Sequence, residues 1–194
     1  MEIRKYLTKD KALFLVVTLA YSLYMITNYL HLNYYSTHIF IDDIIQFSPV
    51  FIYFYILLYP LLFLPFIVHF TNKEEFRKAC YAIIALNIIE AIFFVVYPTT
   101  ITRPNITGGG LTNFLLSAIY TIDPPHNLFP SLHVSGILLG FFIYIRKSNK
   151  YFILLPLVMV IILSTVFVKQ HYFLDIIAGV ALALLVYLII YRNK

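Results

Sequence analysis

The sequence predicts an all-α membrane protein built as a bundle of six transmembrane helices. Hydrophobic residues make up 61% of the chain and charged residues 12%, whereas a soluble domain is about half apolar and a quarter charged. A transmembrane helix needs about 17–25 mostly apolar residues. Runs of this kind lie near 12–30, 50–70, 79–97, 151–168 and 173–191, and a shorter sixth run lies near 131–145.

The distribution of basic residues predicts how these helices are oriented. A net charge of +5 would suggest a nucleic-acid partner for a soluble protein. Here, however, 12 of the 14 basic residues fall in four segments on one side of a six-span arrangement, at 4–11, 73–78, 146–150 and 192–194. Cytoplasmic loops are rich in Lys and Arg, so we expect both termini in the cytoplasm and no nucleic-acid partner. A five-span arrangement would scatter these charges over both sides.

We interpret residues 1–194 as one integral membrane domain of the plasma membrane. The first apolar run is long for the core of a signal peptide and lacks a clear small-residue cleavage site, so we expect it to remain as a span. The single cysteine, Cys80, excludes an intramolecular disulfide and a thiolate metal cluster.

Two of the three expected outer connections contain apolar segments of their own. In the first, roughly 31–48, Asp42 and Asp43 stand among isoleucines in a piece too short to span, so we expect a surface or re-entrant helix with a solvated acidic pair. The second, about 98–130, has three glycines at 108–110 and then an apolar stretch at 111–122. Long loops with apolar segments are often lids, and we expect this stretch to cover a site.

Polar side chains that are costly in a membrane gather at the outer ends of the spans, and such residues are usually functional. The charge-based topology brings one set to the same depth: Arg103, Ser131, His133, Ser164, Thr165, Lys169, His171 and Asp175. This convergence predicts a site at the extracytoplasmic face.

The chemistry of this set favours phosphoryl transfer. On a helix, His171 and Asp175 share a face, so the carboxylate can fix the imidazole tautomer and leave the other nitrogen free as a nucleophile. The fourth and sixth spans both begin at this face, and helix N-termini favour anions such as phosphate. Arg103 offers a fork that matches phosphate oxygens, and Ser131 can cap a helix and donate to the anion.

At these positions the sequence resembles the type 2 phosphatidic acid phosphatase superfamily of membrane enzymes. The family motifs are Lys…Arg-Pro, Pro-Ser-Gly-His and Ser-Arg-x5-His-x3-Asp, and their counterparts here lie at 103–104, 130–133 and 164–175. The resemblance implies that His171 is the nucleophile, that His133 is the general acid and that Asp175 orients His171. It also implies that Arg103 binds phosphate.

Three departures from the family pattern bear on the substrate. Val96, Leu132 and Thr165 stand where the motifs have lysine, glycine and arginine. Lys169, one turn from Thr165, is a candidate replacement for a missing cation. The stretches "FPSLH" and "HYFLD" are more similar to the inositol phosphorylceramide synthase branch, which transfers a phosphoryl headgroup to a lipid alcohol. With fewer cations, a diester is a better match than a dianionic monoester.

The sequence therefore predicts a membrane lipid phosphatase that acts on lipid-linked phosphate at the outer face through a phosphohistidine. A lipid headgroup phosphotransferase with the same site is the alternative. Two further readings are a zinc enzyme using His126, His133 and His171, and a non-catalytic protein that binds or transports an anionic lipid. We expect no metal and no cofactor. Glu90, inside the third span, is expected to pair with Asn28 or Asn87.

Overall fold

The computed structural model describes residues 2–28, 30, 33–68 and 72–192, with side chains from Asp10 onward except that of Val68. The side chains of Arg4, Lys5 and Lys9, and the whole of Lys194, therefore lie outside the described part of the chain. The elements are α1 (Glu2–Thr27), α2 (Phe40–Ile44), η1 (Pro49–Phe51), α3 (Ile52–Ile56), α4 (Leu58–Val68), α5 (Lys73–Val96), α6 (Leu111–Ile122), α7 (Leu132–Lys147), η2 (Asn149–Leu154), α8 (Leu155–Phe167) and α9 (Phe173–Tyr191).

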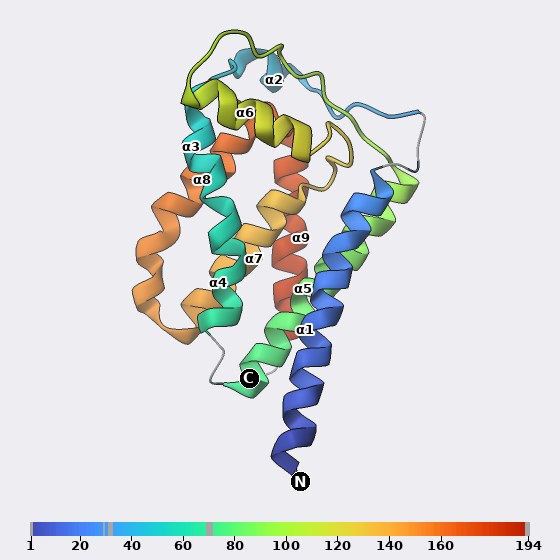
Figure 1. The fold of residues 1–194 in the computed structure, drawn as a ribbon, viewed down its shortest axis with the longest axis vertical. Helices are drawn as coiled ribbons and strands as arrows, with labels where there is room; N and C mark the ends of the chain where they lie inside the picture. The colour runs from blue at the N-terminus through green and yellow to red at the C-terminus, as the bar shows by residue number, and fades with distance from the viewer. Residues whose placement is uncertain (1, 29, 31–32, 69–71, 193–194) are drawn as a thin grey trace.

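The described residues form a multi-pass helical membrane protein. Five helical stretches are long and apolar enough to cross a membrane: Asp10–Thr27, Pro49–Ile67, Lys73–Val96, Asn149–Phe167 and Phe173–Tyr191. These correspond to the five long apolar runs of the sequence, so those predictions are confirmed. The sixth run forms α7, which at 16 residues is shorter than the other five. It lies inside the bundle, packed against α9, α4, α5 and α8 (Figure 1). Whether it counts as a sixth span stays a prediction.

Two prolines shape the second stretch. A proline clashes with the carbonyl four residues earlier and leaves it without an N–H donor. For Pro60 this position is Ile56, where α3 ends and the chain restarts as α4. For Pro65, inside α4, the freed carbonyl is that of Leu61, and the Tyr144 hydroxyl of α7 donates to it. A side chain of α7 therefore satisfies the carbonyl that Pro65 leaves without a donor.

The antiparallel helices α1 and α5 define the two ends of the bundle. At one end Arg77 Nε lies 2.6 Å from Asp10 Oδ1, and at the other the rings of Tyr24 and Phe94 pack with centroids 5.9 Å apart. The end at Tyr24 also holds the starts of α7 and α9, and we call it the histidine end. The described parts of both chain termini lie at the opposite end (Figure 1).

A glycine on α9 allows the start of α7 to approach closely. A Cβ atom added at Gly179 would lie 2.9 Å from the carbonyl oxygen of Ser131 and 3.1 Å from Cβ of Val134. The N–H of Ser131 in turn donates to the carbonyl of Asp175, at 3.1 Å. This close approach brings the beginnings of α7 and α9 side by side.

Two long segments cover the histidine end. The segment at 33–48 and the segment at 98–130 cross over the helices there, and α6 lies across the bundle (Figure 1). An isolated bridge between Tyr35 and Thr99 joins the two segments, and a second bridge, between Thr100 and His126, lies within the segment at 98–130. The amphipathic α6 buries Leu116 and Ile119 in a cluster with Ile52 and Tyr55 of α3; that it covers a functional site stays a prediction.

The expectation of a solvated acidic pair is wrong for Asp42. Its side chain is 6% exposed and accepts hydrogen bonds from the N–H groups of Ile39, at 2.9 Å, and Phe173, at 2.8 Å. Asp43 is exposed and lies 2.9 Å from His38 Nε2. Asp42 is buried because it satisfies a free N–H at the start of α9, a contact that the local sequence does not indicate.

Candidate active site

Two histidine side chains meet at the histidine end. Nδ1 of His133, in the first turn of α7, lies 2.9 Å from Nε2 of His171, in the connection before α9. At this distance one of the two nitrogens carries the hydrogen, and its assignment follows from the other contacts of each ring. His171 is 3% exposed, so the pair lies inside the protein.

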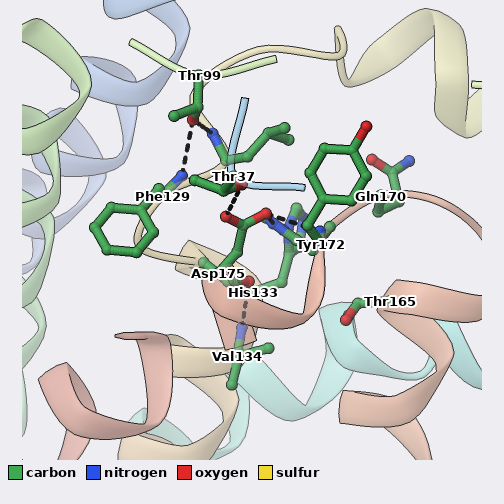
Figure 2. A network of polar contacts seen from close by, with 12 residues as sticks. Thr37, Thr99, Phe129, His133, Val134, Thr165, Gln170, Tyr172 and Asp175 are labelled. Carbon is green, nitrogen blue, oxygen red and sulfur yellow. Dashed lines mark hydrogen bonds and ion pairs between the residues drawn. The ribbon is translucent and has the colours of Figure 1, made fainter. Parts of the chain in front are cut away.

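Asp175 lies on the other side of His171. Its Oδ2 is 3.5 Å from His171 Nδ1 and accepts the N–H of Tyr172 at 2.8 Å. Its Oδ1 accepts a hydrogen bond from the Thr37 hydroxyl at 2.6 Å, and Figure 2 shows Asp175 held between Thr37 and Tyr172. A carboxylate in this position favours hydrogen on Nδ1 of His171 and leaves Nε2 with a lone pair.

The contact between His171 and Asp175 is present, but the expectation that both residues lie on one face of a helix is wrong. α9 begins only at Phe173, with Tyr172 as its N-cap and Asp175 as the third helical residue. The two side chains meet because Asp175 turns back to cap its own helix, not because they lie on one helical face.

The end of α8 sets the position of His171. The carbonyl of Thr165 accepts the N–H groups of Gln170, at 2.9 Å, and His171, at 3.2 Å. Lys169, which precedes Gln170, has a left-handed φ of 51°, a conformation that is uncommon for a non-glycine residue. Thr165 therefore acts on the site through its backbone.

The predicted hydroxyl donors of α8 do not face the histidines. Ser164 Oγ donates to the carbonyl of Ile161 at 2.6 Å and Thr165 Oγ1 to that of Ile162 at 2.7 Å. Both residues are fully buried, and Figure 2 places the Thr165 side chain apart from His133 and Asp175. Each hydroxyl hydrogen is used within its own helix.

Ser131 joins the two helices of the site. Its hydroxyl caps α7 by accepting the N–H of Val134 at 3.2 Å, as expected for a serine at this position. The segment before it is held by Thr99, whose hydroxyl accepts the N–H groups of Leu128 at 2.9 Å and Phe129 at 3.0 Å (Figure 2). The side chain of Ser131 thus has a structural partner.

His133 has two further partners that the sequence did not reveal. Its Nε2 lies 3.0 Å from the Tyr55 hydroxyl and 3.6 Å from Oδ2 of Asp123. The other carboxylate oxygen, Oδ1, accepts a hydrogen bond from the hydroxyl of Tyr24. Sequence reasoning did not single out Asp123, although its place 10 residues before His133 was an available signal. Nothing in the pattern around Tyr24 or Tyr55 marks either residue.

Arg103 is anchored beside this network. Its Nη1 donates to the carbonyl of Asp123 at 2.6 Å, its Nη2 donates to Oε1 of Gln170, and its guanidinium lies 4.6 Å from the ring centre of Tyr120. Burial lowers the pKa of Arg103, and the nearby Asp123 opposes that shift. Its Nε is buried and has no hydrogen-bond partner among the described residues, so one N–H remains to be satisfied.

The side chain of Lys169 is half-buried and bonded to a neighbouring segment. Its Nζ donates to the carbonyl of Ile45 at 2.6 Å, next to the segment that carries Thr37 and Asp42. The ammonium therefore fastens the segment at 33–48 to the turn before His171.

His126 and Glu90 have surroundings of their own. The ring of His126 stacks on that of Tyr34, with centroids 4.2 Å apart, and across the described residues no three His, Cys, Asp or Glu side chains are grouped as a metal site would need. The zinc hypothesis thus gains no support from the geometry. Glu90 accepts a hydrogen bond from Ser135 of α7, so the expected pairing with Asn28 or Asn87 is wrong; Asn87 donates to the carbonyl of Ile83 at 2.9 Å.

Comparison with known protein families finds a family that matches this chain. The model of the PAP2 superfamily matches residues 21–189, a range that covers most of the chain and contains every residue of the site described above. No curated protein and no solved structure matches the chain.

Proposed function

The chain belongs to the PAP2 superfamily, a group of phosphatase and phosphotransferase-type enzymes, and from that premise we propose that it is a membrane phosphatase for lipid-linked phosphate. The reaction would pass through a covalent phosphohistidine on His171. The observation that carries this proposal is the arrangement of Asp175, His171 and His133, with nitrogen–oxygen and nitrogen–nitrogen distances of 3.5 and 2.9 Å.

In the first step, Nε2 of His171 attacks the phosphorus atom and the bond from phosphorus to the leaving oxygen breaks. Asp175 holds hydrogen on Nδ1 and stabilises the positive charge that develops on the ring. His133 enters this step as the imidazolium, with hydrogen on both nitrogens; it donates the hydrogen of Nδ1, the atom that faces His171, to the leaving oxygen and becomes the neutral imidazole. The two rings must separate to admit the phosphoryl group, since their nitrogens are in hydrogen-bond contact in this state.

In the second step, water attacks the phosphohistidine and the bond between nitrogen and phosphorus breaks. His133 now accepts a proton from that water, which returns both rings to their starting states. The Tyr55 hydroxyl, 3.0 Å from Nε2 of His133, is placed to hold this ring through both steps.

Charge stabilisation would come from Arg103 and from the start of α7. The unsatisfied Nε–H of Arg103 supplies a donor of the kind that phosphate oxygens accept, while the other guanidinium donors fix its position. Positioning and electrostatic stabilisation are most of what phosphoryl transfer needs from a protein. In this proposal Ser131, Ser164, Thr165 and Lys169 hold the backbone of the site and do not themselves bind phosphate.

We further propose that the chain is one membrane domain in which α7 is the sixth span. Both described ends of the chain lie at the end opposite the histidines, which an even number of crossings requires. The basic segments at 73–78 and 146–150 lie at that same end, where Arg146 Nε is 3.3 Å from Glu75. The positive-inside rule then puts the histidines at the extracytoplasmic face of the plasma membrane.

The test is phosphate release by the purified protein from a panel of lipid phosphates, with trapping of acid-labile phosphate on the protein. Wild-type protein should release phosphate and carry the label, and His171→Ala should do neither. Release that persists in His171→Ala, or the absence of release from every lipid phosphate offered, would overturn the proposal. Binding of a lipid headgroup without turnover would instead favour the hypothesis of a non-catalytic protein that binds or transports an anionic lipid.

One observation favours headgroup transfer, as in the inositol phosphorylceramide synthase branch, as a second candidate. The Asp123 carboxylate lies 3.6 Å from Nε2 of His133 and adds negative charge on the far side of this ring from His171, so a singly charged diester is a better electrostatic match than a dianionic monoester. In that reaction a lipid alcohol replaces water in the second step. Incubation with a phospholipid and an alcohol acceptor separates the two candidates, because a transferred headgroup appears only in the second.

A further inference from the structure

A cavity lies far from the histidines, at the opposite end of the bundle. Its volume is about 600 Å³, and its walls come from α1, α4 and α5: Asp10, Lys11, Phe14, Phe66, Ile67, Lys73 and Phe76. Asp10 and Tyr24 stand 14 residues apart on α1, which corresponds to about 20 Å along a helix. The cavity is therefore separate from the site beside Tyr24.

The interior of the cavity is aromatic. Phe66 packs edge-on against Phe14, with centroids 5.3 Å apart, and against Phe76, with centroids 6.1 Å apart. Phe66 is buried, whereas Phe14 and Ile67 are exposed at the side of the bundle. A volume of this size is typical of small-molecule sites, and these walls match an acyl chain that enters from the side.

The rim of the cavity is basic. Lys11 and Lys73 line it, and its one carboxylate, Asp10, is already paired with Arg77 Nε at 2.6 Å. The next acidic residues on α5 also have cationic partners, Glu74 with Lys78 at 2.7 Å and Glu75 with Arg146 at 3.3 Å. The described cations Lys11, Lys73, Arg77, Lys78 and Arg146 at this end outnumber the three carboxylates beside them, so the rim has a net positive charge.

We propose that this cavity binds one anionic phospholipid of the leaflet opposite the histidines. Lys11 and Lys73 contact its phosphate, and one acyl chain lies against Phe14, Phe66 and Phe76. Basic pockets between transmembrane helices are suited to anionic headgroups, and the aromatic interior excludes a small soluble anion as the occupant. The site does not depend on the reaction proposed for His171.

The chain lacks tryptophan, so a single introduced tryptophan reports on this cavity alone. In Phe66→Trp, reconstituted in phosphatidylcholine vesicles, we expect phosphatidylglycerol brominated on its acyl chains to quench the fluorescence at about tenfold lower mole fraction than brominated phosphatidylcholine. Leu188→Trp, on the exposed face of α9, is the matched control and should be quenched equally by both lipids.

Two further arms test the chemistry of the site. Adding Lys11→Gln and Lys73→Gln to Phe66→Trp should abolish the preference, whereas adding Lys147→Gln and Lys150→Gln, at the same end but outside the cavity, should preserve it. Equal quenching of Phe66→Trp by the two brominated lipids would overturn the proposal. Displacement of brominated phosphatidylglycerol by inorganic phosphate would also overturn it, because the occupant would then be a free anion. Neither readout uses enzyme activity, so failure here is distinct from failure of the proposed function.

Discussion

The hydroxyl of Thr37 donates a 2.6 Å hydrogen bond to Oδ1 of Asp175, across 138 residues of sequence. Both side chains are buried, and the same carboxylate faces His171 through Oδ2. The segment at 33–48 is therefore part of the candidate site. It is fastened nearby by Asp42, which accepts the N–H of Phe173, and by the carbonyl of Ile45, which accepts from Lys169.

Replacing Thr37 tests whether this contact orients the catalytic pair. Thr37→Val keeps the shape but leaves Oδ1 of Asp175 without its donor, and we expect phosphate release to fall about 10–100-fold, as for partners that orient a reacting group. Thr37→Ser keeps the hydroxyl and should retain most activity. The measurement is kcat as a function of pH, because a change in His171 protonation moves the profile. Equal activity in both variants would contradict a positioning role.

The role of His133 as general acid predicts a dependence on the leaving group. Loss of a general acid costs about 10²–10⁴-fold in rate when the leaving oxygen is a poor leaving group. His133→Ala should therefore be strongly impaired on lipid phosphate but much less so on a phosphate ester of an acidic phenol. Trapped phosphohistidine should still form with the phenol ester. A uniform loss on both substrates would argue against proton donation by His133.

Asp123 tests the electrostatic argument for substrate choice. Its carboxylate lies 3.6 Å from His133, so Asp123→Asn should raise the turnover of monoesters relative to diesters by about tenfold, since one unfavourable charge is removed. Tyr24→Phe is the matched control, because it removes a hydrogen bond to Asp123 and leaves the charge in place. The ratio of the two turnover rates checks the prediction, and an unchanged ratio in Asp123→Asn refutes it.

Arg103 should not tolerate lysine. Its guanidinium bonds the carbonyl of Asp123 and the side chain of Gln170 at the same time, and the single ammonium of a lysine does not reproduce this planar fork. We expect Arg103→Lys to lower kcat/KM about 10–100-fold, close to the loss in Arg103→Gln. Kinetics of phosphate release check it, and near wild-type kcat/KM in Arg103→Lys would show that charge alone is sufficient.

The packing of α7 against α9 predicts a stability effect at Gly179. A methyl group there would meet the Ser131 carbonyl at 2.9 Å, so Gly179→Ala should destabilise the protein by about 1–3 kcal/mol, the usual cost of overpacking. Gly109→Ala, where an added Cβ has no neighbour within 4 Å, should leave the thermal unfolding midpoint nearly unchanged. Unfolding followed in detergent compares the two. Equal midpoints would contradict the close approach of α7 and α9.

The sequence by itself determined the helical membrane class, the five long spans and the family. Hydropathy is a local property of neighbouring residues, so an apolar run predicts a membrane-spanning helix without information on how that helix packs. The candidate site residues His133, His171 and Asp175 could likewise be identified, because the family motifs have a characteristic spacing along the chain.

Only the tertiary structure decided what each polar side chain contacts. Thr37 and Asp42 come from a segment distant in sequence, Tyr55 from α3 and Asp123 from the end of α6, and Ser135 rather than Asn87 bonds Glu90. A buried polar group must find a partner, but which partner reaches it depends on how loops cross the ends of the helices. For the same reason the contact between His171 and Asp175 arises from a helix cap, which helical periodicity did not predict.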